Sequence, residues 1–178
     1  MEIRRYGLVA SVMLGFALHA EAENIVFSDA CVKALCVANW DNNNDGELST
    51  DEAADVISLG KVFREKTDIR SFNELKYFTG LCSIDKYAFY KSSIQTVTFP
   101  PTVTLIGEYA FSQSSISGEL VVPGTVKDIG DYSFYSCQRL SSVVLEEGVQ
   151  TVGWHAFSGP VRMLSLPSTL TSASSMFI

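Results

Sequence analysis

Oxygen-bearing side chains recur at alternate positions between residues 41 and 52, where the sequence is DNNNDGELSTDE. A Ca²⁺ ion takes about six to eight hard oxygen ligands, and a helix-flanked loop supplies them from positions 1, 3, 5, 7, 9 and 12. Such a loop turns sharply at position 6, where Gly46 stands. The pattern therefore predicts a calcium site whose ligands are Asp41, Asn43, Asp45, Glu47 through its carbonyl, Ser49 directly or through water, and Glu52.

Two features of this loop do not require a metal. Asn and Asp side chains form local turns by bonding to nearby backbone amides. Ser49 and Glu52 also have the spacing of a capping box, which begins a helix unaided. Both interpretations can hold together, because the residue at position 9 of these loops caps the following helix. A single loop with few carboxylates predicts modest affinity, roughly 10⁻⁴–10⁻³ M, and hence a structural ion rather than a sensor.

The loop needs a helix on each side to hold its ends. We expect an entering helix over residues 29–40, an exiting helix over 50–59 with Gly60 as its C-cap, and Leu48 pointing into the core. Residues 23–66 would then form an EF-hand-like helix–loop–helix cap. Dockerins use the same loop for calcium-dependent assembly, but in two copies. The single copy here leaves calcium-dependent assembly as a lesser alternative.

A second pattern repeats along the rest of the chain. A six-residue motif recurs as IDKYAF, IGEYAF, IGDYSF and VGWHAF, with phenylalanines 22, 23 and 23 residues apart. A fifth, degenerate copy ends at Phe177. Apolar or β-branched runs, three of them ended by proline, lie between these motifs and predict short strands at residues 94–99, 120–122, 140–145 and 161–166. The motif would turn the chain back, with glycine at the tight place and phenylalanine inward.

One copy of this length cannot bury its own apolar face, so neighbouring copies must stack into a continuous core. We therefore expect about 4.5 copies of 22–23 residues within residues 67–178. The predicted fold class is α+β. It is a solenoid of short β-strands with irregular turn-like returns, preceded by the helix–loop–helix cap.

The repeat resembles the BspA-type (Treponema-like) leucine-rich repeat of bacterial surface proteins, directly over residues 81–178 and with a lead-in at 68–80. Glu146 and Ser133 depart from the pattern, where proline and alanine are usual, and the last copy lacks its Ile-Gly. The resemblance implies a leucine-rich-repeat solenoid and an EF-hand-like loop ahead of it. No polar cap precedes the end at Ile178, which suggests a fragment or end-to-end association.

The N-terminus predicts export. Residues 1–22 are predicted to form a signal peptide, because two arginines are followed by an apolar run over residues 6–18 and by an Ala-Glu-Ala cleavage site. The apolar run is shorter than the ~20 residues that cross a bilayer, so no transmembrane span is expected in the mature chain. The net charge is −7, and the acidity lies mainly in residues 23–80. An acidic chain without basic clusters excludes nucleic acid and anionic membranes as favoured partners.

Catalytic chemistry is sparse. The expected mature chain has one histidine, His155, in the tyrosine position of the repeat, where we expect an outward or half-buried side chain. The spacing of the four cysteines favours free, buried thiols over disulfides, and Cys137 falls where a small buried residue suits. No motif of a hydrolase, metalloprotease or nucleotide-binding enzyme is present. An enzyme or an enzyme-associated module acting on glycans remains the alternative.

These observations predict a secreted or cell-surface interaction protein of adhesin type. Its partner would be an extracellular or surface protein, such as a host matrix protein, or a glycan. Strand alternation turns certain repeat positions away from the core, and these are the expected contacts: Gln95, Thr98, Glu119, Ser141 and Arg162.

Overall fold

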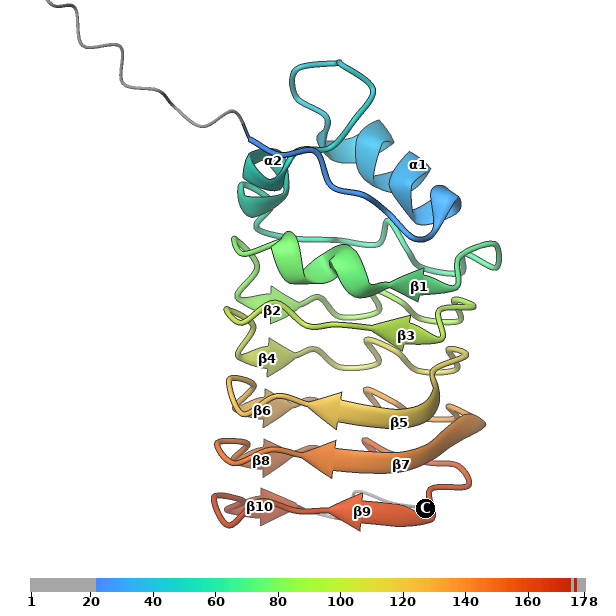
Figure 1. Ribbon diagram of the computed structural model, residues 1–178. Coiled ribbons are helices and arrows are strands. Elements are labelled where there is room, and N and C mark those ends of the chain that lie inside the picture. Colours follow the sequence, from blue (N-terminus) through green and yellow to red (C-terminus); the bar gives the residue numbers. More distant parts are fainter. Residues whose placement is uncertain (1–21, 174, 176–178) are drawn as a thin grey trace, which may run out of the picture.

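The computed structural model describes residues 22–173 and residue 175. The chain winds into a β-solenoid of stacked turns, with two short helices at its N-terminal end and the C-terminus at the opposite end (Figure 1). Each turn contributes one strand to a front ladder and one to a back ladder, and all the paired strands run parallel. The expected solenoid of short strands is therefore confirmed, but helix is scarce and β-solenoid describes the fold better than α+β.

The back ladder is a continuous five-stranded sheet in the order β10-β8-β6-β4-β2. Its strands have two residues each: β2 (Ser83–Ile84), β4 (Leu105–Ile106), β6 (Asp128–Ile129), β8 (Thr151–Val152) and β10 (Ser172–Ala173). These strands carry the Ile/Val position of the repeat, where the sequence had predicted only irregular returns. Because the copies are in phase here, equivalent residues lie one strand spacing apart and their backbones pair.

The front ladder is interrupted. The strands β1 (Ser71–Phe72) and β3 (Thr96–Val97) form one pair, whereas β5 (Ser117–Val122), β7 (Arg139–Leu145) and β9 (Met163–Ser165) form a separate three-stranded sheet. The strands β3, β5, β7 and β9 overlap the runs that the sequence predicted as strands, whereas β1 lies in the lead-in segment, where no strand was predicted. Figure 1 shows the front strands spaced more widely between β3 and β5 than elsewhere. The front ladder therefore opens at one level of the stack, while the back ladder does not.

A column of phenylalanines fills the space between the ladders. Phe89, Phe111, Phe134 and Phe157 are buried and stack face to face, with successive ring centroids 4.8, 5.1 and 5.4 Å apart. The inward orientation expected for these rings is confirmed. Stacked aromatic pairs at this spacing add roughly 0.5–1.5 kcal/mol per pair to the burial of apolar area. The same column continues upward, since the ring of Phe63 stacks on Phe89 at 5.1 Å.

The glycines of the repeat allow neighbouring turns to approach closely. A Cβ on Gly107 would lie 2.7 Å from the carbonyl oxygen of Ile84 in the previous turn, and one on Gly130 would lie 2.8 Å from the Glu108 nitrogen. The left-handed conformation that turns the chain instead belongs to the tyrosine position, with φ of 56° at Tyr109. Glycine is thus needed for contact between turns, not for the turn itself.

The N-terminal region departs from the expected cap. Helix α1 (Ala30–Trp40) matches its prediction, but α2 (Thr50–Ala54) ends well before residue 59. Farther along, the Asp85 carboxylate holds the chain, because its Oδ2 accepts hydrogen bonds from the backbone amides of Leu59 and Gly60 at 2.8 and 2.9 Å. The segment after α2 therefore joins the first repeats instead of continuing the helix. The predicted helix–loop–helix cap is not confirmed. The predicted boundary between cap and repeats, after residue 66, stays a prediction.

A short 3₁₀ helix, η1 (Asn73–Tyr77), follows β1 on the front side of the first turn of the solenoid (Figure 1). Its Glu74 is buried and accepts a hydrogen bond from the Ser28 backbone amide at 3.0 Å. The backbone of the N-terminal segment is also hydrogen-bonded to the predicted calcium loop, because the Ile25 amide donates to the Leu48 carbonyl at 2.8 Å. Leu48 is fully buried, as expected. The described N-terminal residues thus form part of one core with the repeats.

All four cysteines are free, and two of them are buried. Burial raises the pKa of the Cys137 thiol to about 11. Cys31 is half-buried and Cys82 is exposed, so the expectation that every cysteine would be buried is wrong for these two residues. Among the described residues, none of the helices has the length and apolar character needed to cross a bilayer. The predicted signal peptide falls almost wholly on residues 1–21, outside the described part of the chain.

Candidate functional site

The loop between α1 and α2 is held together by its own carboxylates. Asp41 accepts hydrogen bonds from the backbone amides of Asn44 and Gly46 at 2.7 and 2.9 Å. Asp45 accepts one from the Glu47 amide at 2.8 Å. Asn44 and Gly46 both adopt positive φ, at 60° and 84°, and so form the sharp turn that the glycine predicted. These bonds bring the side chains of the first half of the loop toward its centre.

Glu52, the expected ligand from the second half, is engaged with the same loop. Its Oε1 accepts hydrogen bonds from the amides of Asn42 and Asn43, while Oε2 completes the predicted capping box with Ser49. The hydrogen bond from the Ser49 amide and these further bonds lower the pKa of Glu52. Within residues 22–173 and 175, no group of three His, Cys, Asp or Glu side chains gathers around one point that could hold a metal. The remaining expected oxygens are those of Asn43, Ser49 and the Glu47 carbonyl.

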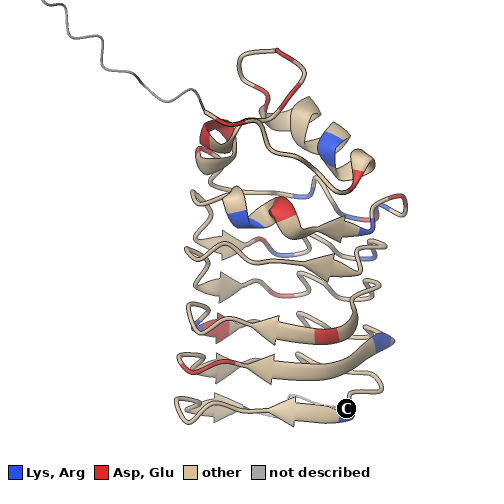
Figure 2. Cartoon of the chain, in the orientation of Figure 1, with Lys and Arg blue, Asp and Glu red and all other residues tan. Residues whose placement is uncertain are grey.

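Acidic side chains dominate this end of the molecule. Figure 2 shows them in the loop and on α2, above the solenoid. The segment from residue 41 to 55 carries six acidic residues and no basic one: Asp41, Asp45, Glu47, Asp51, Glu52 and Asp55. Only Glu47 of this group forms an ion pair within the described chain, with Lys33 at 2.6 Å. The local charge therefore favours a cation, whether or not the side chains are already arranged around it.

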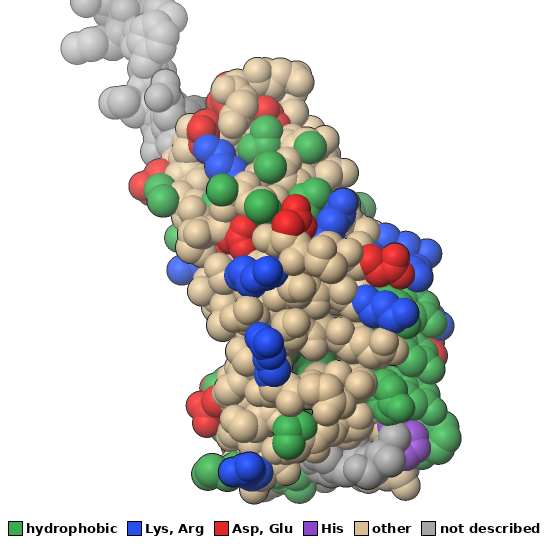
Figure 3. Space-filling view, turned by 90° about the vertical axis from the view of Figure 1, so that its right-hand side faces the viewer, with side chains coloured by type: hydrophobic (Ala, Val, Ile, Leu, Met, Phe, Trp, Pro, Cys, Tyr) green, Lys and Arg blue, Asp and Glu red, His purple; other side chains and the backbone are tan. Residues whose placement is uncertain are grey.

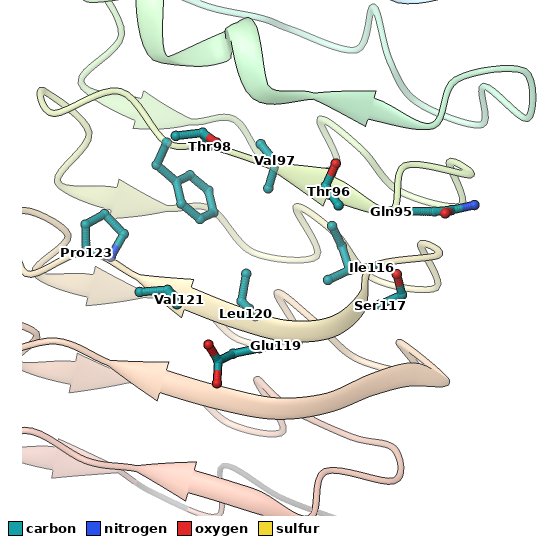
Figure 4. A pocket seen from close by; sticks show the side chains of 11 residues that line it. Gln95, Thr96, Val97, Thr98, Ile116, Ser117, Glu119, Leu120, Val121 and Pro123 are labelled. Carbon is teal, nitrogen blue, oxygen red and sulfur yellow. The ribbon is translucent and has the colours of Figure 1, made fainter. Parts of the chain in front are cut away.

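A cleft of about 320 Å³ lies where the front ladder opens between β3 and β5. Figure 4 shows the two strands on opposite sides of the cleft, with Ile116 and Leu120 between them and the Glu119 carboxylate on the other side of β5, toward β7. Phe99, Ile116 and Leu120 are buried and form its apolar base, and Val121 stands at the surface with 42% of its area exposed. The polar side chains in its lining come from Gln95, Thr96, Thr98, Ser117 and Glu119.

The backbones on the two sides of the cleft are largely unpaired with each other. One hydrogen bond crosses at the closed end, from the Ser117 amide to the Gln95 carbonyl at 3.2 Å. Among the described residues, no further backbone hydrogen bond joins 96–99 to 118–123. Each strand therefore presents a free edge at this level, and free strand edges are the places where an additional strand pairs.

The difference in repeat length explains the opening. Ile94 and Pro100 are separated by five residues, whereas six separate Ile116 from Pro123. The additional residue falls in the front segment, where Gly118 adopts a φ of 73° and the pairing of β5 with β7 shifts register. One copy is thus longer than its neighbour on the front side only. This inequality was visible in the sequence and could have located the cleft.

The structure brings some of the predicted contact residues together and separates others. Gln95, Thr98 and Glu119 line the cleft. Arg162 lies with Glu119 around a separate shallow hollow on the outer surface of β5, β7 and β9. Ser141 lies in neither lining, and its hydroxyl donates to the Gly118 carbonyl at 3.0 Å. The sequence did not identify the apolar part of the cleft: Val97, Phe99, Ile116, Leu120, Val121 and Pro123.

An aromatic row follows one edge of the solenoid. Tyr87, Tyr109 and Tyr132 stack with centroids 5.1 and 4.8 Å apart, and the row continues to half-buried His155 at 5.6 Å. In Figure 3 this edge appears on the right as a column of hydrophobic side chains that ends near the histidine. The rings largely cover one another's faces. The expected repeat position of His155 is therefore confirmed, and the row stabilises the edge of the stack.

Comparison with known proteins places the repeats in a family. The profile of the BspA type leucine rich repeat region matches residues 61–177, in six copies. A leucine rich cell surface protein from Faecalibacterium prausnitzii A2-165 is a solved structure with 20% identity over 57% of this chain, and the match covers 42% of that chain with a TM-score of 0.30. That likeness is too low to support an argument. No curated protein sequence matches. Because the profile covers more than half of its residues, the chain belongs to the BspA type leucine rich repeat family.

Proposed function

We propose that this chain is a secreted or cell-surface interaction protein that holds an extended segment of a partner protein in the cleft between β3 and β5. Membership of the family supports a surface repeat protein, because stacked repeats form extended surfaces for interaction. The observation that carries the proposal is the interruption of the front ladder, which leaves two facing strand edges above an apolar base.

The cleft has the two kinds of group that bind an extended peptide. Free backbone amides and carbonyls at the strand edges would pair with the peptide backbone, and this pairing contributes affinity with little dependence on sequence. The apolar base would receive alternate side chains of the peptide, which contributes specificity. Glu119 is exposed beside the cleft, and its carboxylate is turned toward β7, where it accepts a hydrogen bond from the Ser142 hydroxyl at 3.4 Å. Its charge near the cleft favours a basic residue in the segment. We therefore expect the partner to present a segment of alternating apolar and basic residues.

A structural calcium ion is the second part of the proposal. Asp41, Asn43, Asp45, Ser49, Glu52 and the Glu47 carbonyl would supply the oxygens. The positive φ values at Asn44 and Gly46 support it, because they already give the loop its sharp turn. Binding would require the Glu52 carboxylate to exchange its bonds with the Asn42 and Asn43 amides for the ion. The ion would then fix the loop between α1 and α2 and so stiffen the N-terminal end of the solenoid.

Selection from a displayed library of extended peptides tests the binding proposal. The protein would be immobilised and peptides retained by it would be sequenced. We expect enrichment of segments with alternating apolar residues and at least one basic residue. The substitution Val121→Arg places a long charged side chain at the cleft and should abolish retention of these peptides.

The matched control is Val144→Arg, on the outer surface of β7 and outside the cleft lining. Both substitutions add the same charge to the front surface, and the thermal unfolding of each variant shows whether it is folded. The proposal predicts that Val144→Arg retains the peptides. It is wrong if no peptides are enriched, or if peptides bind the two variants equally well.

A further inference from the structure

A separate hollow lies on the outer surface of the back ladder, away from the cleft between β3 and β5. It has a volume of about 380 Å³ and spans β6, β8 and the start of β10. Gly130 and Gly153 form its floor, and their lack of side chains is already explained by the close approach of neighbouring turns. The side chains around it are those of Asp128, Asp131, Thr151, Trp154 and Ser172. The hollow is open to solvent, and its lining combines these polar groups with apolar surface that includes the indole.

Trp154 is unusual for its place in the repeat. The equivalent position holds Lys86, Glu108 and Asp131 in the three preceding copies. Charged residues suit that position because it faces water, yet in the fourth copy an indole stands there with 49% of its area exposed. An exposed indole contributes less to folding than a buried one, since only the area removed from water is stabilising. Packing against the core therefore does not explain a tryptophan at this position.

The indole is nevertheless held in place. Its ring centroid lies 4.1 Å from that of His155 and 5.5 Å from that of Tyr132, which it meets edge to face. Its backbone amide donates to Asp131 Oδ1 at 2.7 Å. The aromatic row thus ends in a fixed indole beside the hollow. A binding surface that is fixed before the ligand arrives loses little conformational entropy on binding.

Two carboxylates beside the indole each keep one oxygen available. Asp128 Oδ1 accepts a hydrogen bond from the Thr151 hydroxyl at 2.6 Å, and Asp131 Oδ1 accepts the Trp154 amide. Neither Oδ2 accepts a hydrogen bond from any residue that the structure describes. Both side chains are exposed, so no buried charge is involved. One oxygen of each carboxylate is therefore positioned by the scaffold while the other faces a ligand or water.

We propose that this hollow binds a neutral carbohydrate. The exposed face of an indole covers the apolar C–H face of a sugar ring, and this contact removes apolar area from water on both sides. Fixed carboxylate oxygens accept hydrogen bonds from sugar hydroxyls, and such charge-assisted bonds are stronger than neutral ones. Two carboxylates repel uronic acids and sulfated sugars. This ligand class differs from the polypeptide proposed for the cleft between β3 and β5, and the two sites lie on opposite ladders.

Nuclear magnetic resonance of the indole N–H groups tests this site. The chain has two tryptophans, and Trp40 packs against Phe63 and Phe78 at the other end of the molecule, so its signal is an internal control. The probes are the tetramers of β-1,4-glucose, α-1,4-glucose, β-1,4-mannose and β-1,4-N-acetylglucosamine, with tetragalacturonate as the acidic counterpart. We expect at least one neutral tetramer to shift the Trp154 signal in a saturable way at millimolar concentration or below, and tetragalacturonate to leave it unchanged.

Variants then separate a binding role from a structural one. The double substitution of Asp128→Asn and Asp131→Asn keeps the shape of both side chains and should weaken binding at least about tenfold, or ~1.4 kcal/mol. Trp154→Ala should abolish binding, as read by saturation transfer to the sugar, with unfolding temperature as a check. Glu108→Gln, at the equivalent repeat position outside the hollow, and Val121→Arg, in the front cleft, should bind the sugar normally. The proposal is overturned if no neutral tetramer binds, if tetragalacturonate binds as well, or if the double variant keeps full affinity.

Discussion

At the scale of single residues, the position before each repeat phenylalanine is buried and holds a small side chain. It holds alanine at residues 88, 110 and 156 but serine at 133. The Ser133 side chain is fully buried, and its hydroxyl makes no hydrogen bond within the described structure. A buried hydroxyl without a partner costs free energy that alanine does not. Ser133 therefore lowers the stability of the fold relative to the alanine that the other copies have at this position.

Replacing Ser133 by alanine should raise the free energy of unfolding by about 1 kcal/mol, because a desolvated hydroxyl is lost and no volume is added. Denaturant-induced unfolding measures this change. The matched control is Ser158→Ala, because the Ser158 hydroxyl accepts a hydrogen bond from the Ser136 amide at 2.8 Å. That substitution should lower the stability by a similar amount. If Ser133→Ala also lowers the stability, the Ser133 hydroxyl has a partner, such as a buried water.

Asp29 makes the N-terminal end sensitive to acid. Partial burial opposes its ionisation, but hydrogen bonds from the backbone amides of Arg70, Val32, Ser71 and Cys31 hold its pKa below the ordinary value. A carboxyl group with a lowered folded pKa contributes stability above its unfolded value of about 3.9, and that contribution is lost as the pH falls through the folded pKa. Stability should therefore decrease below about pH 4.

The substitution Asp29→Asn should remove part of this acid sensitivity. It should lower the stability at neutral pH by about 1–3 kcal/mol, because asparagine has a single acceptor oxygen. That oxygen can accept from the cap of α1 or from the amides of Arg70 and Ser71, but not from both. The gap between the parent and the variant should narrow as the pH falls. Circular dichroism melts over a pH series measure both effects. A gap that stays constant at low pH would show that Asp29 does not titrate with folding.

At the scale of elements, the column of stacked phenylalanines holds the two ladders together. Phe111 lies between Phe89 and Phe134 at 4.8 and 5.1 Å, and it also meets Phe99 edge to face at the base of the cleft. Replacing Phe111 by alanine should destabilise the fold by about 3–5 kcal/mol, because the stacked neighbours cannot close the cavity. Thermal and denaturant unfolding check this value. A decrease in the free energy of unfolding of less than about 1 kcal/mol would contradict this, because it would mean that the neighbouring turns close the cavity.

The loop between α1 and α2 makes a prediction about calcium. If the ion binds only the folded state, calcium should add about 2.7 kcal/mol to the free energy of unfolding at a hundred times the dissociation constant. The unfolding temperature should therefore rise with calcium concentration. Asp41→Ala and Glu52→Ala should remove this dependence, whereas Asp51→Asn, at a position that offers no ligand, should keep it. Melting in chelator and over a calcium series that reaches about 10–100 mM, a hundred times the expected dissociation constant, measures the effect. If both alanine variants respond to calcium as the parent does, the calcium proposal is wrong.

At the scale of the whole molecule, the sequence predicted whatever depends on repetition. In-phase copies determine the stack, the inward phenylalanines and the half-buried repeat position of His155, and all three are observed. The back ladder was missed because strands of two residues have too few side chains for a recognisable alternation. Helix α2 was predicted too long because Leu59 and Gly60, expected at its C-terminal end, instead donate their backbone amides to the distant Asp85 carboxylate. Local propensity does not contain such a contact.

The candidate site was only partly predictable for a similar reason. Alternation identified Gln95, Thr98 and Glu119 as outward-facing, and they line the cleft. It could not show that β3 and β5 fail to pair, since that depends on the relative lengths of neighbouring copies in three dimensions. Ser141 and Arg162 are outward by the same rule but lie outside the cleft lining. Repeat positions therefore predict exposure well, and the grouping of exposed residues poorly.

Hydrogen–deuterium exchange of the protein with and without a selected peptide tests the central claim most directly. That claim is that the gap in the front ladder receives an extended segment. We predict that bound peptide slows the exchange of backbone amides in residues 96–99 and 117–122, where the strand edges face the cleft, and leaves the back strands β6 and β8 unchanged. Protection confined to another surface, or no protection of these two segments by a peptide that binds, would contradict the account.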